Sequence, residues 1–222
     1  MNGDADLLAS FSPLAEEGIV LCVPFHLLNS FSGDLEIGAQ DCSANKNGAF
    51  TGEISAEMIA EAGVSYCIVG HSERRTYWKE TNELVAAKAS RLLENNITPI
   101  ICVGETLEQK QNGKTLEVIE NQVWQSIPKI ETIHGEIIIA YEPVWAIGTG
   151  LVPTMDDIQT VHDFIANILK KMGLPKTAIL YGGSVKATNA ADIMNIENVG
   201  GVLVGGASLD PIQFKGIIDG RK

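Results

Sequence analysis

The sequence is poor in basic residues. Its 16 lysines and arginines stand against 28 aspartates and glutamates, which gives a formal net charge of −12 at pH 7. Because nucleic acids and anionic membrane surfaces are bound through basic patches, this balance argues against both kinds of partner. The chain also lacks an apolar window of about 20 residues and a basic N-terminal stretch followed by an apolar run. We therefore expect a soluble, cytoplasmic protein, in which an anionic substrate would need local donors.

Patterns typical of disulfide frameworks and metal sites are missing too. Cys22, Cys42, Cys67 and Cys102 show no C-x-x-C spacing, and the histidines show no H-E-x-x-H spacing. Three of the cysteines lie in apolar strand-like runs. This fits buried free thiols in a reducing compartment better than a disulfide framework. We expect no structural metal.

The sequence does contain one pattern that repeats along its whole length. Seven short, continuously apolar stretches, typical of parallel strands covered on both faces, occupy residues 19–25, 35–40, 66–70, 98–104, 137–142, 178–184 and 201–206. Helical candidates alternate with them at residues 4–17, 56–62, 80–95, 115–127, 155–172, 187–196 and 210–218. No linker or low-complexity tract interrupts the alternation, so residues 1–222 are predicted to form a single α/β domain.

Polar residues and glycines follow nearly all of these stretches. In an open sheet the ligand site gathers at one switch point, whereas a barrel draws on loops around a whole rim. The even distribution favours a (β/α)8 barrel. About seven strands are visible, however, and such a barrel needs eight.

Glu142 is the first candidate catalytic residue. It ends the apolar run 137–142 and is followed directly by a glycine-bearing loop, residues 143–153. Burial makes the charged form of a carboxylate costly, and chemistry is the usual reason to accept that cost. We interpret Glu142 as a catalytic base beneath a lid.

His71 and two glycine pairs are further candidates. His71 follows a strand and is predicted to begin a short helix, whose positive end disfavours imidazolium and leaves a neutral hydrogen-bond donor. An isolated histidine more often satisfies buried backbone groups, and the adjacent Glu73, Arg74 and Arg75 fit an ordinary surface ion-pair cluster equally well. The pairs 182–183 and 205–206 suit an anion site, although turns also use glycine.

The longest irregular stretch runs from Asp41 to Ser55, with an aromatic residue at its tip. Long loops on a compact domain often carry function or an interface, and a plain solvated loop is an equally good reading.

Taken together, the motifs resemble the triosephosphate isomerases. The matching stretches occur in the same order as in that family, at residues 38–40, 48–53, 69–75, 140–150, 181–185 and 203–209. The resemblance implies a TIM (β/α)8 barrel that interconverts dihydroxyacetone phosphate and D-glyceraldehyde 3-phosphate in glycolysis and gluconeogenesis. It also implies that no external cofactor is needed.

The resemblance assigns roles to individual residues. Glu142 would move a proton between adjacent carbons, His71 would donate to the enediolate oxygens, and Glu73 would support the polar side of the pocket. The phosphate would be held by backbone N–H groups, those of Gly148, Ser184, Gly205 and Gly206. Leu203 would form part of the apolar wall, and closure of residues 143–153 would exclude water.

The resemblance also implies a homodimer. The loop from Asp41 to Ser55 would insert into a neighbouring subunit. Thr51 would then lie beside the neighbour's active site, and Glu53 would pair with the partner's Arg74.

One departure concerns the N-terminus. The family begins with a strand ending in Asn-x-Lys-Met-Asn-Gly, whereas this chain begins Met1-Asn2-Gly3. We therefore expect the first strand and the catalytic lysine to lie upstream, with Met1 an internal methionine of a longer natural chain. The alternatives are a truncated, catalytically impaired relative that binds phosphate or dimerises, and another barrel enzyme acting on a phosphorylated sugar or indole precursor.

Overall fold

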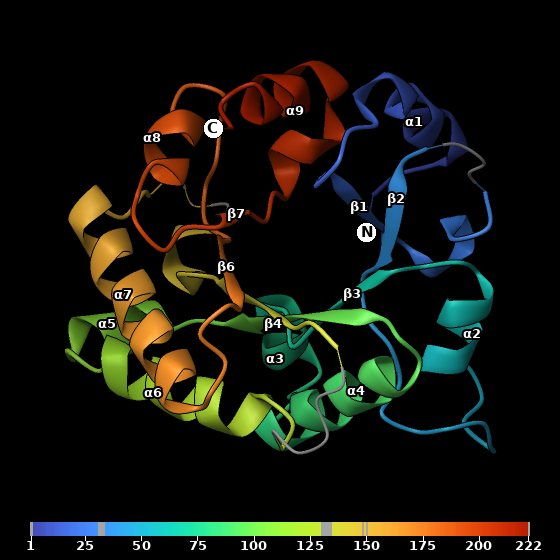
Figure 1. Cartoon of the computed structure of the whole chain (residues 1–222), viewed down its shortest axis with the longest axis horizontal. Coiled ribbons are helices and arrows are strands. Elements are labelled where there is room, and N and C mark those ends of the chain that lie inside the picture. Colours follow the sequence, from blue (N-terminus) through green and yellow to red (C-terminus); the bar gives the residue numbers. More distant parts are fainter. Residues whose placement is uncertain (1, 31–33, 130–134, 148, 150, 222) are drawn as a thin grey trace.

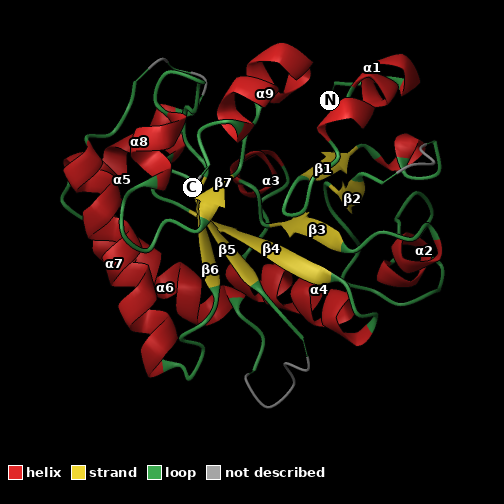
Figure 2. Cartoon of the chain, turned by 45° about the horizontal axis from the view of Figure 1, so that its top comes forward, coloured by secondary structure: helices red, strands yellow, loops and turns green. Residues whose placement is uncertain are grey.

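The fold is built on one parallel sheet. A computed structural model describes residues 2–30, 34–129, 135–147, 149 and 151–221. In these residues seven parallel strands pair in sequence order: β1 (Val20–Val23), β2 (Glu36–Ala39), β3 (Tyr66–Val69), β4 (Thr98–Val103), β5 (Ile138–Tyr141), β6 (Ala178–Tyr181) and β7 (Gly201–Val202). All seven predicted strands are confirmed. Figures 1 and 2 show the strands inside a ring of helices, which is the TIM-barrel arrangement.

The surrounding helices are of unequal length. They are α1 (Ala5–Ser10), α2 (Ala56–Glu61), α3 (Ser72–Tyr77), α4 (Asn82–Glu94), α5 (Leu107–Gln111), α6 (Thr115–Ser126), α7 (Met155–Lys171), α8 (Ala190–Met194) and α9 (Pro211–Ile218). None of the helices in the described part of the chain is long and apolar enough to cross a membrane.

Alternate residues of each strand face two different apolar layers. On β4, Ile101 and Val103 pack with the helices, whereas Ile100 and Cys102 join the inner cluster with Ala140 of β5. Strands covered on both sides need apolar residues at successive positions, which explains the continuous runs in the sequence.

The first and last parts of the chain lie side by side. Rings of Phe11, after α1, and Phe214, on α9, pack edge to face at 5.9 Å, and α1 and α9 are neighbours in Figure 1. The strands at the two ends of the sheet order, β1 and β7, each have one strand partner within the described residues. The upstream eighth strand remains a prediction.

Several predicted boundaries were wrong. The helix expected at residues 4–17 ends at Ser10, and a 3-10 turn, η1 (Ser12–Leu14), follows, because Pro13 cannot continue an α-helix. The strand expected at 201–206 stops at Val202, and Gly206–Leu209 form another 3-10 turn, η5. Helix α8 begins at Ala190 rather than at 187, and α5 was not predicted.

The loop from Asp41 to Ser55 contains no helix or strand, as predicted. Its first residue is fixed by charge: Asp41 accepts from the buried Lys88 at 2.7 Å and pairs with Arg74 at 2.9 Å. Glu80, also buried, bonds both cations at 2.6 Å. A buried charge needs such partners, so the base of this loop has a defined position.

Candidate active site

Glu142 lies directly after β5, and its carboxylate is almost completely buried, with 2% of the residue exposed. Two donors from the end of β3 hold it. The Oε1 atom is 2.9 Å from Nε2 of His71, and Oε2 accepts the backbone N–H of Ser72 at 3.0 Å. The structure thus brings together the two residues that the sequence singled out. Ser72 contributes through its backbone, which side-chain reasoning could not reveal.

The start of α3 fixes the orientation of His71. His71 is the N-cap residue of this helix, and its Nδ1 accepts the backbone N–H of Glu73 at 3.3 Å. An Nδ1 atom that accepts a hydrogen bond carries no proton. The ring in this arrangement is therefore the neutral tautomer, with its proton on Nε2, facing Glu142.

The pKa of His71 is nevertheless raised above its ordinary value. Burial lowers this pKa, but the hydrogen bond and the negative charge of Glu142 raise it by more, and Glu73 adds to the rise. This is opposite to the direction predicted from the helix start. Helix α3 has only 6 residues, and the electrostatic effect of its N-terminus is smaller than that of a carboxylate in direct contact.

Two glycines make room for Glu142. A Cβ atom on Gly104 would lie 1.7 Å from the carbonyl oxygen of Glu142, and one on Gly182 would lie 2.9 Å from its Cγ. A Cβ atom on Gly183 would likewise lie 2.1 Å from the hydroxyl oxygen of Tyr181. The 182–183 pair therefore has a packing reason for its glycines.

The second glycine pair has a different environment. A Cβ atom on Gly205 or Gly206 would meet nothing within 4 Å. Both residues are exposed, and Gly205 is the N-cap residue of η5. Packing does not demand glycine here, and the bare backbone stays accessible.

A second buried carboxylate, Glu105, anchors the start of the 143–153 loop. It accepts the indole N–H of Trp145 at 2.8 Å and the Tyr141 hydroxyl at 3.2 Å. Its backbone oxygen accepts the N–H of Val144 at 3.1 Å. Burial raises the pKa of Glu105. Sequence reasoning gave this residue no role, although a carboxylate directly after the 98–104 run was a usable signal.

The remaining predicted residues lie around this centre. The Glu73 side chain is 69% exposed, with Oε2 3.8 Å from Nδ1 of His71. Ser184 donates its hydroxyl to the carbonyl oxygen of Ala146 at 2.7 Å. Leu203 packs against the inner apolar cluster, whereas Gly148 lies outside the described residues.

The interface candidates lie elsewhere on the molecule. Thr51 and Glu53 are exposed in the 41–55 loop. Arg74 bonds Asp41 and Glu80 of its own chain and lies over the ring of Trp78 at 5.0 Å.

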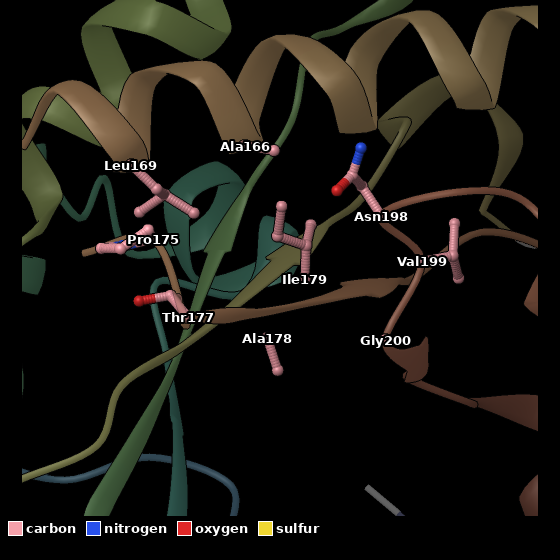
Figure 3. Close-up of a pocket in the computed structure, with 9 residues that line it drawn as sticks. All are labelled: Ala166, Leu169, Pro175, Thr177, Ala178, Ile179, Asn198, Val199 and Gly200. Atoms are coloured by element: carbon pink, nitrogen blue, oxygen red, sulfur yellow. The ribbon is translucent and has the colours of Figure 1, made fainter. Parts of the chain in front are cut away.

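Two cavities differ sharply in position. One of about 10 Å³ lies beside Glu142 and is lined by Ser72, Cys102 and Gly104, among others. Another, of about 190 Å³, is lined by α7 residues and by Thr177, Ala178 and Gly200 at the amino ends of β6 and β7 (Figure 3). Barrel enzymes carry their chemistry at the carboxyl ends of the strands, so the larger cavity lies at the wrong end for this site.

A buried carboxylate bonded to an imidazole at the carboxyl rim of a parallel barrel defines a class, that of barrel enzymes equipped for proton transfer. Known proteins identify the family within that class. A family model described as triosephosphate isomerase matches residues 4–221. The triosephosphate isomerase of Hyphomonas neptunium is 47% identical, with 98% of this chain and 93% of the relative covered.

Two further triosephosphate isomerases are similar to this chain. The triosephosphate isomerase of Vesicomyosocius okutanii is 46% identical, with coverage of 88% of this chain and 83% of the relative. The crystal structure of triosephosphate isomerase from Bartonella henselae superposes with a TM-score of 0.89 at 37% identity, covering 99% of this chain and 94% of that one. The chain belongs to the triosephosphate isomerase family. It is an isomerase, and the alternative of a barrel enzyme for another sugar or an indole precursor is set aside.

The contact between Glu142 and His71 gives a prediction about titration. Glu142→Gln removes the negative charge that most strongly raises the pKa of His71, so this pKa should fall. NMR titration of the His71 ring protons measures it directly.

Glu73→Gln is the matched control. Its carboxylate is exposed and more distant, so the pKa of His71 should fall less in this variant. A pKa in Glu142→Gln equal to or above that of the unchanged protein would show that Glu142 does not control the imidazole.

Proposed function

We propose that this chain interconverts dihydroxyacetone phosphate and D-glyceraldehyde 3-phosphate by proton transfer through an enediolate, without an external cofactor. The observation that carries the proposal is the buried Glu142 carboxylate, bonded to Nε2 of His71 at 2.9 Å. Family membership supports the substrate class, and the rim geometry supports the residue roles.

Glu142 is the base in this proposal. Its two oxygens are occupied by His71 and Ser72 in the described arrangement, so it leaves these donors to reach a substrate carbon. It removes a proton from one carbon and returns it to the neighbouring carbon. Exclusion of water strengthens such a step, because a desolvated carboxylate is a stronger base.

His71 is the donor to the substrate oxygens. Its Nε2 proton, which faces Glu142 in the described arrangement, becomes available when the carboxylate moves away. A neutral imidazole that donates to a developing oxyanion stabilises the enediolate and can pass a proton between its two oxygens. Glu73 supports the ring from the Nδ1 side through its backbone N–H.

Local donors bind the substrate phosphate. The net charge of −12 repels an anion, so attraction has to come from nearby N–H groups. The accessible backbone of Gly205 and Gly206 supports this role, and Ser184 and Gly148 complete the set by family resemblance. Leu203 contributes the apolar wall.

Residues 143–153 act as the lid. Two hydrogen bonds fix the start of this loop and support this assignment. They join Trp145 to Glu105 and Ser184 to Ala146. Closure keeps water from the enediolate, which otherwise can expel phosphate. The four free thiols suit the reducing cytoplasm, where we place the reaction as a step of glycolysis and gluconeogenesis.

We further propose a homodimer formed through the loop from Asp41 to Ser55. Three aromatic side chains are exposed: that of Phe50 in this loop by 45%, and those of Tyr77 and Trp78 at the end of α3 by 71% and 63%. Aromatic side chains are enriched at protein interfaces. Thr51 would lie beside the neighbour's site, and Glu53 would join the ionic cluster around the partner's Arg74.

Replacement of Glu142 tests the catalytic role. Glu142→Asp withdraws the base by one methylene, and a displacement of about 1 Å in such a step lowers the rate by on the order of a hundredfold. A coupled assay of both reaction directions gives kcat, and urea unfolding should show little change in stability.

Glu120→Asp makes the same chemical change on the exposed face of α6 and should leave the rate unaltered. Full activity in Glu142→Asp would remove Glu142 from the role of base. Absence of isomerase activity both in the unchanged chain and in a chain extended upstream by the expected Asn-x-Lys strand would contradict the proposed function itself.

The dimer has its own test. Tyr77→Glu places a charge in the proposed apolar contact, where burial of an unpaired charge is costly. Sedimentation should show a shift from dimer to monomer at equal protein concentration. Ile212→Glu alters a residue on α9 that is 85% exposed and should not change the oligomeric state. A monomeric unchanged protein, or a fully dimeric Tyr77→Glu variant, would overturn this interface.

A further inference from the structure

Lys110, on α5, lies between the two ends of the 143–153 loop. Its Nζ atom is 4.4 Å from the centroid of the Trp145 ring, near the start of the loop. The same Nζ atom is 3.4 Å from Oδ1 of Asp157, in the first turn of α7 just beyond the loop. One ammonium group therefore contacts a residue at each end.

The contact with Trp145 completes the placement of the indole. The ring edge is fixed by the bond from its N–H to the buried Glu105, and the ammonium lies over the ring face. A cation over an indole is attracted by the negative face of the ring. Without Lys110, the ring would keep its edge bond but could tilt about it.

The contact with Asp157 reaches the first turn of α7, where Asp157 forms a capping box with the N-cap residue Thr154. Oδ2 of Asp157 accepts from the backbone N–H of Thr154 at 3.2 Å and from its hydroxyl at 3.0 Å, and the Thr154 hydroxyl accepts the Asp157 N–H in return. This capping box leaves Oδ1 to bond Lys110. Burial raises the pKa of Asp157, but the bonds from Thr154, together with Lys110, lower it by more.

Helix α5 itself is firmly placed. Its own capping box joins Thr106 and Gln109. Glu105, the residue before its N-cap, bonds the loop start through both its side chain and its backbone. Lys110 therefore extends from a fixed support, and its two contacts bind the loop ends to one rigid element.

We propose that Lys110 is a positioning residue that holds both ends of the 143–153 loop at a fixed separation. This inference rests on the proposed function, in which that loop covers the substrate. Fixed ends leave less conformational freedom to be lost when the loop covers the substrate. Loss of the ammonium should therefore weaken the apparent affinity for substrate without changing the catalytic groups.

Steady-state kinetics gives the first test. Lys110→Met keeps the length of the side chain but removes the charge, and kcat/KM should fall about 3- to 30-fold, the range expected for one partly exposed cation–π contact and one partly exposed ion pair. The fall should lie mainly in KM. Lys110→Arg should restore most of the loss, and Lys170→Met, an exposed lysine on α7, should behave like the unchanged protein.

Fluorescence gives a second test that needs no activity. The chain has 3 tryptophans, so Trp78→Phe with Trp124→Phe leaves Trp145 as the only one. In that background Lys110→Met should make Trp145 more accessible to acrylamide quenching, and Lys110→Arg should not. Asp157→Asn should increase quenching in the presence of Lys110 and have a smaller effect in Lys110→Met, because the two residues act as a pair.

The outcomes separate this inference from the proposed function. Unchanged kinetics and unchanged quenching in Lys110→Met, with normal isomerase activity in the parent, would overturn the role of Lys110 alone. An Arg variant as impaired as the Met variant would overturn it as well. A parent that lacks isomerase activity even when extended upstream by the expected Asn-x-Lys strand, but shows the predicted quenching pattern, would refute the proposed function while the positioning role of Lys110 stands.

Discussion

The site depends on the two hydrogen bonds that hold the carboxylate of Glu142. A buried negative charge without donors would be strongly destabilising, and the imidazole of His71 and the backbone N–H of Ser72 supply those donors. Both come from the end of β3, whereas Glu142 comes from the end of β5. The parallel register aligns Val69 with Ile101 and Val103 with Tyr141, which brings these strand ends to the same rim. The barrel topology is therefore what makes the pairing possible.

The same two bonds also limit what the site can do. Hydrogen bonds to a charged group contribute about 1.5–3 kcal/mol each, and both must be exchanged when Glu142 turns toward a substrate. The exchange is favourable only if contacts with the incoming ligand and the covering loop compensate for these two hydrogen bonds. Catalysis therefore also depends on the surrounding elements: the glycines that leave space for the Glu142 backbone, the open backbone of Gly205 and Gly206, and the hydrogen bonds at the start of the loop.

Much of the fold and part of the site could be predicted from sequence. Continuous apolar runs identified all seven strands, because strands covered on both faces need apolar residues at successive positions. Strand ends were placed too late because residues such as Gly104 and Glu142 follow an apolar run directly in sequence but already belong to the rim loops. The short helix α5 was missed because it contains no buried residue. The contacts of Ser72, Glu105 and Lys110 join segments far apart in the chain, and the direction of the His71 pKa depends on one such contact. No local pattern encodes these.

Isotope exchange shows directly whether Glu142 removes the proton from the substrate carbon. Dihydroxyacetone phosphate is incubated with the protein in D2O, and proton NMR follows the hydroxymethyl C–H signal beside the carbonyl. If Glu142 is the base, the unchanged protein should introduce deuterium at this carbon, and Glu142→Gln should do so at no more than a small fraction of that rate. Exchange at the full rate in Glu142→Gln would show that Glu142 is not the base.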